Sequence, residues 1–135
     1  MTVGYSGTPL AKKLGIKEST TLVVLNDPGH FFEIVAPLPG DLTIRTSARG
    51  KAQVAVFFTK RSSELARRLD SMGRLIFPAG ALWVAWPKRA SKVPTDMTED
   101  VVREVVLPAG LVDVKVAAID ETWSGLKLMW RRELR

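Results

Sequence analysis

Short apolar runs alternate with longer amphipathic segments along most of this chain. Three of the runs, residues 22–25, 54–58 and 82–86, contain only apolar residues. Such unbroken runs are typical of strands that are covered on both faces of a parallel sheet. A weaker run at residues 42–44 predicts a fourth strand at an edge of that sheet.

The end of the chain has a different period. Apolar residues at 112, 114 and 116 alternate with Asp113 and Lys115, and residues 126–130 alternate in the same way. The link at residues 120–123 is short enough to join the two segments as an antiparallel hairpin. On the exposed faces of this hairpin we expect Asp113, Lys115 and Lys127 to form cross-strand ion pairs.

Three short helices carry start and stop signals. Thr8 is expected to cap the first, which has a proline at its opening position and ends at Gly15. Asp27 is expected to cap the second, at residues 30–36. Thr98 is expected to cap a later helix that is rich in valine.

The longest predicted helix follows the 54–58 run, with Ser62 or Ser63 as its cap. Apolar residues at spacings of three and four then line one face of it: Leu65, Leu69, Met72 and Ile76. Together the elements predict a single α/β domain over residues 1–135. Its class is Rossmann-like and doubly wound, with a mostly parallel sheet, helices on both faces and a C-terminal antiparallel β-hairpin.

Composition narrows the chemistry. The chain has no cysteine, which excludes disulfides, thiolate nucleophiles and zinc–thiolate sites. No apolar run approaches the roughly 18 residues that span a bilayer, and residues 1–5 do not resemble a secretory leader, so a cytoplasmic location without membrane contact is expected. The net charge is +6, and the excess of lysine and arginine lies before residue 93. Such a balance suits a small anion, nucleic acid or an acidic partner protein.

Familiar catalytic motifs are missing. Gly29 is the only glycine in the loop after the first strand, so no G-x-G-x-x-G loop follows it, and the lack of any glycine-Lys-Ser/Thr triplet excludes a phosphate-binding P-loop. His30 is the only histidine, which rules out a histidine-rich metal site and a Ser-His-Asp triad within one chain. The sequence therefore assigns no cofactor, metal or catalytic residue.

Basic pairs follow two of the buried strands. Lys60 and Arg61 come after the 54–58 run, and Lys88 and Arg89 come after the 82–86 run. Ligands of open α/β sheets bind outside the carboxyl ends of the parallel strands, so these cations predict an anion-binding rim. Solvated loops at strand ends are the alternative explanation for the same residues.

Further residues belong to this predicted site. Ser62 would add a hydroxyl and a free amide at a helix start, and Trp86 and Trp123 could line the mouth unless they pack in the core. Asp27 either caps a helix or accepts hydrogen bonds from a ribose. His30 either acts as an acid or base or packs at a strand–helix junction.

Four segments of the chain resemble the bacterial domain of unknown function 3052: residues 4–15, 82–88, 110–116 and 120–127. This resemblance spans nearly the whole chain. It implies a small bacterial protein, cytoplasmic in location, and carries over no catalytic residue. The predicted sheet with its terminal hairpin also resembles the carboxyl-terminal half of class I methyltransferases, although their acidic and glycine-rich loops are not visible here.

Three functional hypotheses remain open. The first is a non-catalytic module that binds a small anionic ligand or a partner protein at the rim. The second is a small Rossmann-like enzyme, methyltransferase-like or acting on a nucleotide or phosphorylated metabolite, with Asp27 or His30 beside the cations. The third is weak nucleic-acid binding, for which the basic residues at 45–51 and 88–92 would have to form one stripe.

Overall fold

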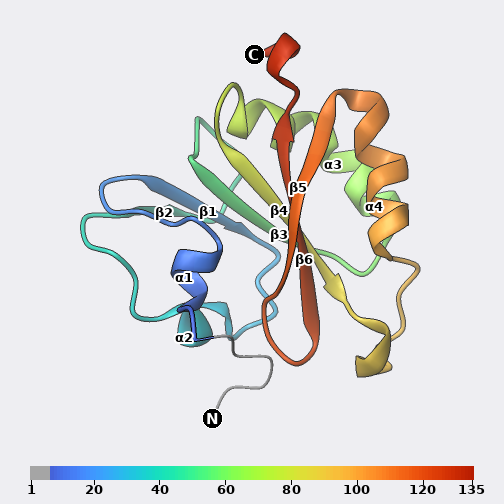
Figure 1. Ribbon diagram of the computed structural model, residues 1–135, viewed down its shortest axis with the longest axis horizontal. Coiled ribbons are helices and arrows are strands. Elements are labelled where there is room, and N and C mark those ends of the chain that lie inside the picture. Colours follow the sequence, from blue (N-terminus) through green and yellow to red (C-terminus); the bar gives the residue numbers. More distant parts are fainter. Residues whose placement is uncertain (1–6) are drawn as a thin grey trace.

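The computed structural model describes residues 7–135. The expectation for residues 1–5 and the first part of the 4–15 segment therefore lie outside the described residues. One sheet of six strands runs through the molecule in the order β2-β1-β3-β4-β6-β5 (Figure 1). Strands β1 to β4 pair in parallel, whereas β6 is antiparallel to both of its neighbours. The strands are β1 (Thr21–Leu25), β2 (Thr43–Arg45), β3 (Val54–Phe58), β4 (Ala81–Pro87), β5 (Leu111–Ala118) and β6 (Trp123–Trp130).

Helices cover both faces of this sheet. In Figure 1, α1 and α2 lie on one side and α3 and α4 on the other. Their bounds are α1 (Leu10–Lys13), α2 (Phe31–Val35), α3 (Ser62–Ile76) and α4 (Glu99–Val106). The predicted fold class, a Rossmann-like and mostly parallel sheet with a terminal antiparallel hairpin, is confirmed. No helix of the described part of the chain is both long and apolar enough to cross a membrane.

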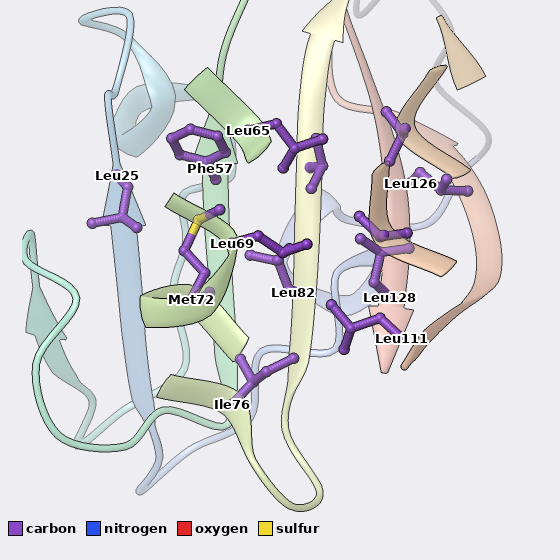
Figure 2. Packing of buried hydrophobic residues seen from close by; sticks show 14 of the residues in the cluster. Leu25, Phe57, Leu65, Leu69, Met72, Ile76, Leu82, Leu111, Leu126 and Leu128 are labelled. Carbon is purple, nitrogen blue, oxygen red and sulfur yellow. The ribbon is translucent and has the colours of Figure 1, made fainter. Parts of the chain in front are cut away.

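The larger core lies between the sheet and α3 and α4. Figure 2 shows the predicted apolar face of α3, including Leu65 and Met72, turned toward side chains of the strands such as Phe57 and Leu82. Both α3 residues are completely buried. Burial of this size stabilises a domain by roughly 25 cal/mol for each Å² of apolar surface removed from water.

The second core lies between the sheet and α1 and α2. Trp83 is completely buried in it, and its indole Nε1 donates a hydrogen bond of 3.0 Å to the carbonyl of Leu14. This bond gives the indole N–H a hydrogen-bond acceptor in place of water, which cannot reach it in the core. Gly125 makes room for the ring, because a Cβ there would lie 3.1 Å from a Trp83 ring carbon.

Two predicted helix caps are wrong, and one is confirmed. Pro9 takes the cap position of α1, so the Thr8 side chain makes no capping bond. Ser62 is the first residue of α3 rather than its cap, because Asp96 supplies the acceptor for its amide. The Thr98 hydroxyl does cap α4 by accepting from the amide of Val101 at 3.1 Å. Gly15, with a φ of +80°, follows the last turn of α1 as predicted.

Candidate functional site

A crevice opens where the chain direction divides across the sheet. From β1 the chain continues to β2 on one side, while β3 leads to β4 on the other, so the loops after β1 and β3 diverge. Such a divergence at the carboxyl ends of parallel strands is the usual ligand position in doubly wound folds. The crevice here has a volume of about 400 Å³. Its walls are formed by Asn26, Pro28, Phe58, Thr59, Lys60, Arg61, Glu64 and Trp123.

A hydrogen-bonded carboxylate lies in this crevice. Glu64, in the first turn of α3, accepts from the Thr59 hydroxyl at 2.6 Å and from the Asn26 side-chain amide at 3.1 Å. Asn26 also donates to the carbonyl of Phe58, which ties the loop after β1 to the end of β3. Thr59 is 3% exposed, and its hydroxyl also accepts from the amide of Arg61 at 3.1 Å. The carboxylate is therefore fixed in place by two strand ends.

Aromatic rings form the wall on the α2 side of the crevice. Phe58 and Trp123 meet edge to face with their ring centroids 5.1 Å apart, and Phe31 packs against Phe58 in the same way at 5.6 Å. Such pairs stabilise by about 0.5–1.5 kcal/mol beyond the area that they bury. The wall is thus rigid and apolar, and it brings together α2, β3 and the start of β6.

Basic residues lie on the other side, where one of the two predicted pairs lines the crevice. Lys60 and Arg61 line the crevice, and Arg61 also borders an adjoining hollow with Arg67, which lies 3.8 Å from Glu64. Lys88 and Arg89 are not among the residues that line either hollow. The amide of Lys88 instead donates to the carbonyl of Thr122 in the hairpin turn.

Carboxylates of the chain itself occupy the helix starts at this rim. Asp96 accepts from both the amide and the hydroxyl of Ser62, at 2.8 and 2.6 Å. These two bonds, the hydroxyl bond most of all, lower the pKa of Asp96. Asp27 accepts from the amides of Gly29 and Phe31, so its carboxylate is bonded to the first amide of α2, although His30 holds the cap position. Ser62 therefore has no free amide or hydroxyl to offer an anion.

Trp86 lies away from the crevice. It is 5% exposed and belongs to the core beneath α3 and α4, on the opposite face of the sheet from Trp83. The expectation that Trp86 lines a pocket mouth is corrected, because strand alternation turns it inward. Trp123, for which the same expectation was stated, does line the crevice.

A histidine–carboxylate pair beside this wall joins the start of α2 to the turn between β5 and β6. The Nε2 of His30, just before α2, lies 2.5 Å from the Asp120 carboxylate in the β5–β6 turn. Burial raises the pKa of Asp120, but hydrogen bonds from His30, Trp123 and Thr122 outweigh it and leave that pKa below its ordinary value. The sequence offered His30 as a candidate but gave no sign of its partner, which lies 90 residues away.

The described residues hold no cluster of three or more histidine or acidic side chains that could bind a metal ion. No protein-family model and no curated sequence matches the chain, so the resemblance to the bacterial domain of unknown function 3052 stays a prediction.

Solved structures with the same architecture are S-adenosylmethionine (SAM) dependent methyltransferases. A SAM-dependent methyltransferase from Aquifex aeolicus is 14% identical with a TM-score of 0.63, covering 95% of this chain and 91% of that one. A putative type 11 methyltransferase from Sulfolobus solfataricus is 10% identical with a TM-score of 0.61, covering 96% and 94%. An O-methyltransferase from neocarzinostatin biosynthesis, in complex with SAM and a naphthoic acid, is 12% identical with a TM-score of 0.62, covering 96% and 51%. At such identities the likeness establishes that this chain has the fold of SAM-dependent methyltransferases.

Proposed function

We propose that this chain binds a nucleoside ligand of the S-adenosylmethionine type in the crevice between β1 and β3. One observation carries the proposal: a fixed carboxylate and an aromatic wall share the switch-point crevice of a methyltransferase-like sheet. The fold alone would not suffice, because one fold serves many functions.

The chemistry of the crevice agrees with such a ligand. An adenine ring would stack or pack against Phe58 or Trp123, and Glu64 would accept hydrogen bonds from ribose hydroxyls or from an ammonium group. Lys60 or Arg61 would pair with the ligand's carboxylate. A volume of about 400 Å³ lies within the usual 300–1,000 Å³ range of small-molecule pockets.

The loop after β1 departs from the glycine-rich pattern. It holds a single glycine, Gly29, and Asp27 is already occupied with the amides that start α2. We therefore expect side chains rather than backbone amides to hold the ligand. S-adenosylmethionine supplies an electrophilic methyl group when bound. The residues that line the crevice would bind and orient the ligand, and the aromatic wall would exclude water from it.

Calorimetric titration with S-adenosylmethionine and S-adenosylhomocysteine tests the proposal. Glu64→Gln keeps the side-chain size and removes the charge, and we expect it to weaken binding about tenfold, since a hydrogen bond to a charged group contributes about 1.5–3 kcal/mol. Glu104→Gln, on an exposed part of α4, is the matched control. Absence of binding by the parent, or equal binding by the parent and Glu64→Gln, contradicts the proposal.

The basic side of the crevice supports a second candidate, a module for a small anionic ligand or for a partner that presents one. Lys60 and Arg61 line the crevice, as that hypothesis requires. The Glu64→Gln variant distinguishes the two functions, because its effect on ligand affinity is expected to be opposite in the two cases. Glu64→Gln weakens a ligand that donates to the carboxylate, whereas it strengthens an anion that the carboxylate repels. Nucleoside triphosphates and phosphosugars are the compounds to titrate for this second candidate.

A further inference from the structure

Two lysines face each other across the terminal hairpin, and a third lies close enough for its charge to act on one of them. We call Lys17, Lys115 and Lys127 the lysine row. The register of the hairpin places Lys115 of β5 directly opposite Lys127 of β6, and Lys127 in turn lies opposite Trp83 of β4. Directly opposed residues in antiparallel strands point to the same face, so the two lysines stand next to the buried tryptophan.

The lysine row lies on the face of the sheet that carries α1. Trp83 reaches the carbonyl of Leu14 on this face, and the Lys115 ammonium lies 6.0 Å from the centroid of the Trp83 ring. Lys17 lies in the segment after α1, and its ammonium helps to lower the pKa of Lys127. Lys13, on α1 itself, donates to the carbonyl of Ala118 at 3.3 Å and so fastens α1 to the hairpin beside the row.

The cross-strand ion pairs predicted for this hairpin are wrong. Asp113 lies opposite Leu128 and forms an ion pair of 3.1 Å with Arg103 on α4, and the register shift that follows it places Lys115 opposite Lys127. Among residues 7–135, no carboxylate forms a salt bridge with any member of the row. Two like charges in directly opposed positions are therefore left facing each other.

This arrangement opposes folding rather than assisting it. Like charges directly across an antiparallel pair are destabilising. Burial lowers the pKa of Lys127, and the ammonium groups of Lys115 and Lys17 lower it further. The lysine stems can cover the Trp83 ring, but an uncharged side chain would do so without repulsion. The Lys115 ammonium gains a cation–π contact with Trp83, but among residues 7–135 no carboxylate compensates the repulsion between Lys115 and Lys127.

We propose that the lysine row is a binding site for a phosphate group. Two ammonium groups that face each other across neighbouring strands, with the charge of Lys17 acting on the same site, suit a compact dianion, which lysine binds as a point charge. The site is separate from the crevice: the row is free of resident carboxylates, whereas Glu64, Asp27 and Asp96 lie at the rim. The proposal goes beyond the nucleoside site and does not depend on it.

Titration of the full chain with inorganic pyrophosphate, followed by amide NMR shifts, tests the site. We expect shifts at the row and about tenfold weaker binding for Lys115→Met and for Lys127→Met, the loss of one charge-assisted contact. Lys92→Met removes an exposed lysine of the β4–α4 loop and serves as the control. Methionine keeps a long stem over Trp83, so a thermal melt should show that each variant remains folded.

The origin of the phosphate is resolved by a second titration. A short single-stranded RNA whose binding is steeply salt-dependent and is weakened by Lys127→Met would identify a nucleic-acid backbone as the source. RNA binding no tighter than that of pyrophosphate would identify a soluble phosphate compound. If pyrophosphate and RNA both fail to bind, or if the row variants bind as well as Lys92→Met, the proposal is overturned. None of these results depends on S-adenosylmethionine.

Discussion

The crevice at the ends of β1 and β3 and the lysine row differ in whether their charged groups have partners. In the crevice, Glu64 receives hydrogen bonds from Thr59 and Asn26, and basic side chains stand at its border. In the row, Lys115 and Lys127 face each other with no carboxylate bound to either among residues 7–135. The charged group of the crevice thus has partners within the protein, whereas the ammonium groups of the row have no carboxylate partner among residues 7–135.

The difference bears on where an anion would bind. Basic residues at strand ends predicted an anion site at the rim, yet the chain's own carboxylates already occupy the start of α2 and the start of α3 there. A resident carboxylate competes with an incoming anion for the same amides. Unsatisfied positive charge is therefore a better indicator of an anion site than the number of lysines and arginines.

The largest effect is expected from substitution of Trp83, the buried residue beneath the lysine row. We expect Trp83→Ala to lower the free energy of unfolding by about 3–5 kcal/mol, because it leaves a cavity in the core. Urea denaturation measures the change, and Trp83→Phe should lose less because it keeps most of the apolar contact. Trp123→Ala, in the crevice wall, is the comparison variant. A loss below about 1 kcal/mol for Trp83→Ala would mean that the indole does not support the row.

The polar floor of the crevice is the next target. Thr59→Val keeps the shape of the side chain but removes the donor to Glu64 and the acceptor for the Arg61 amide. We expect a loss of about 1–3 kcal/mol, the usual result when buried polar groups lose their partner. Thr59→Ser, which keeps the hydroxyl, should stay close to the parent in the same urea titration. Equal stability of the valine and serine variants would show that the network is not needed.

Acid should weaken the rim through its carboxylates. The pKa values of Asp120 and Asp96 are lowered in the folded state, so both add stability above their unfolded pKa of about 3.9 and lose it as pH falls through their folded values. Urea midpoints at pH 7 and at pH 3 measure this loss. Asp120→Asn should reduce the difference between the two midpoints, because the charged form no longer exists.

Asp70→Asn is the control for the acid experiment, since Asp70 is exposed on α3 and its side chain makes none of the side-chain hydrogen bonds or ion pairs of residues 7–135. Its difference between the two midpoints should match that of the parent. If Asp120→Asn also matches the parent, the pair with His30 contributes nothing to the pH dependence.

The smallest expected effect has the opposite sign. Lys127→Met removes the repulsion from Lys115, and we expect it to raise the free energy of unfolding by about 0.2–1 kcal/mol. High-salt buffer should reduce this gain, because salt screens the repulsion in the parent. A variant less stable than the parent at low salt would mean that the ammonium of Lys127 has a favourable partner, and would count against the phosphate site.

Local patterns predicted the framework well. The unbroken runs at 22–25, 54–58 and 82–86 became β1, β3 and β4, because burial on both faces demands apolar residues without interruption. The apolar face of α3 and the terminal hairpin were equally visible, since each has its own period. The predicted position of Lys60 and Arg61 at the end of β3 followed from the same reasoning.

Pairings between distant residues were not predictable from such patterns. Asp96 reaches Ser62 across 34 residues, and Asp120 reaches His30 across 90, and no local spacing records either contact. The one-residue shift between Asp113 and Lys115 is also invisible in an alternating sequence, although it decides which side chains face each other. Because the sequence does not predict these three features, it also does not predict which charged groups at the rim and in the hairpin have partners.

The position of β6 has a consequence for how the molecule is assembled. This strand follows the other five in the sequence, yet it lies inside the sheet, between β4 and β5. While the chain is being synthesised, β4 therefore keeps an open edge until β6 emerges, and an apolar open edge is prone to pair with other chains. Trp123 of the crevice wall and Lys127 of the lysine row both arrive on that strand, so neither site can exist in a nascent chain that ends before them.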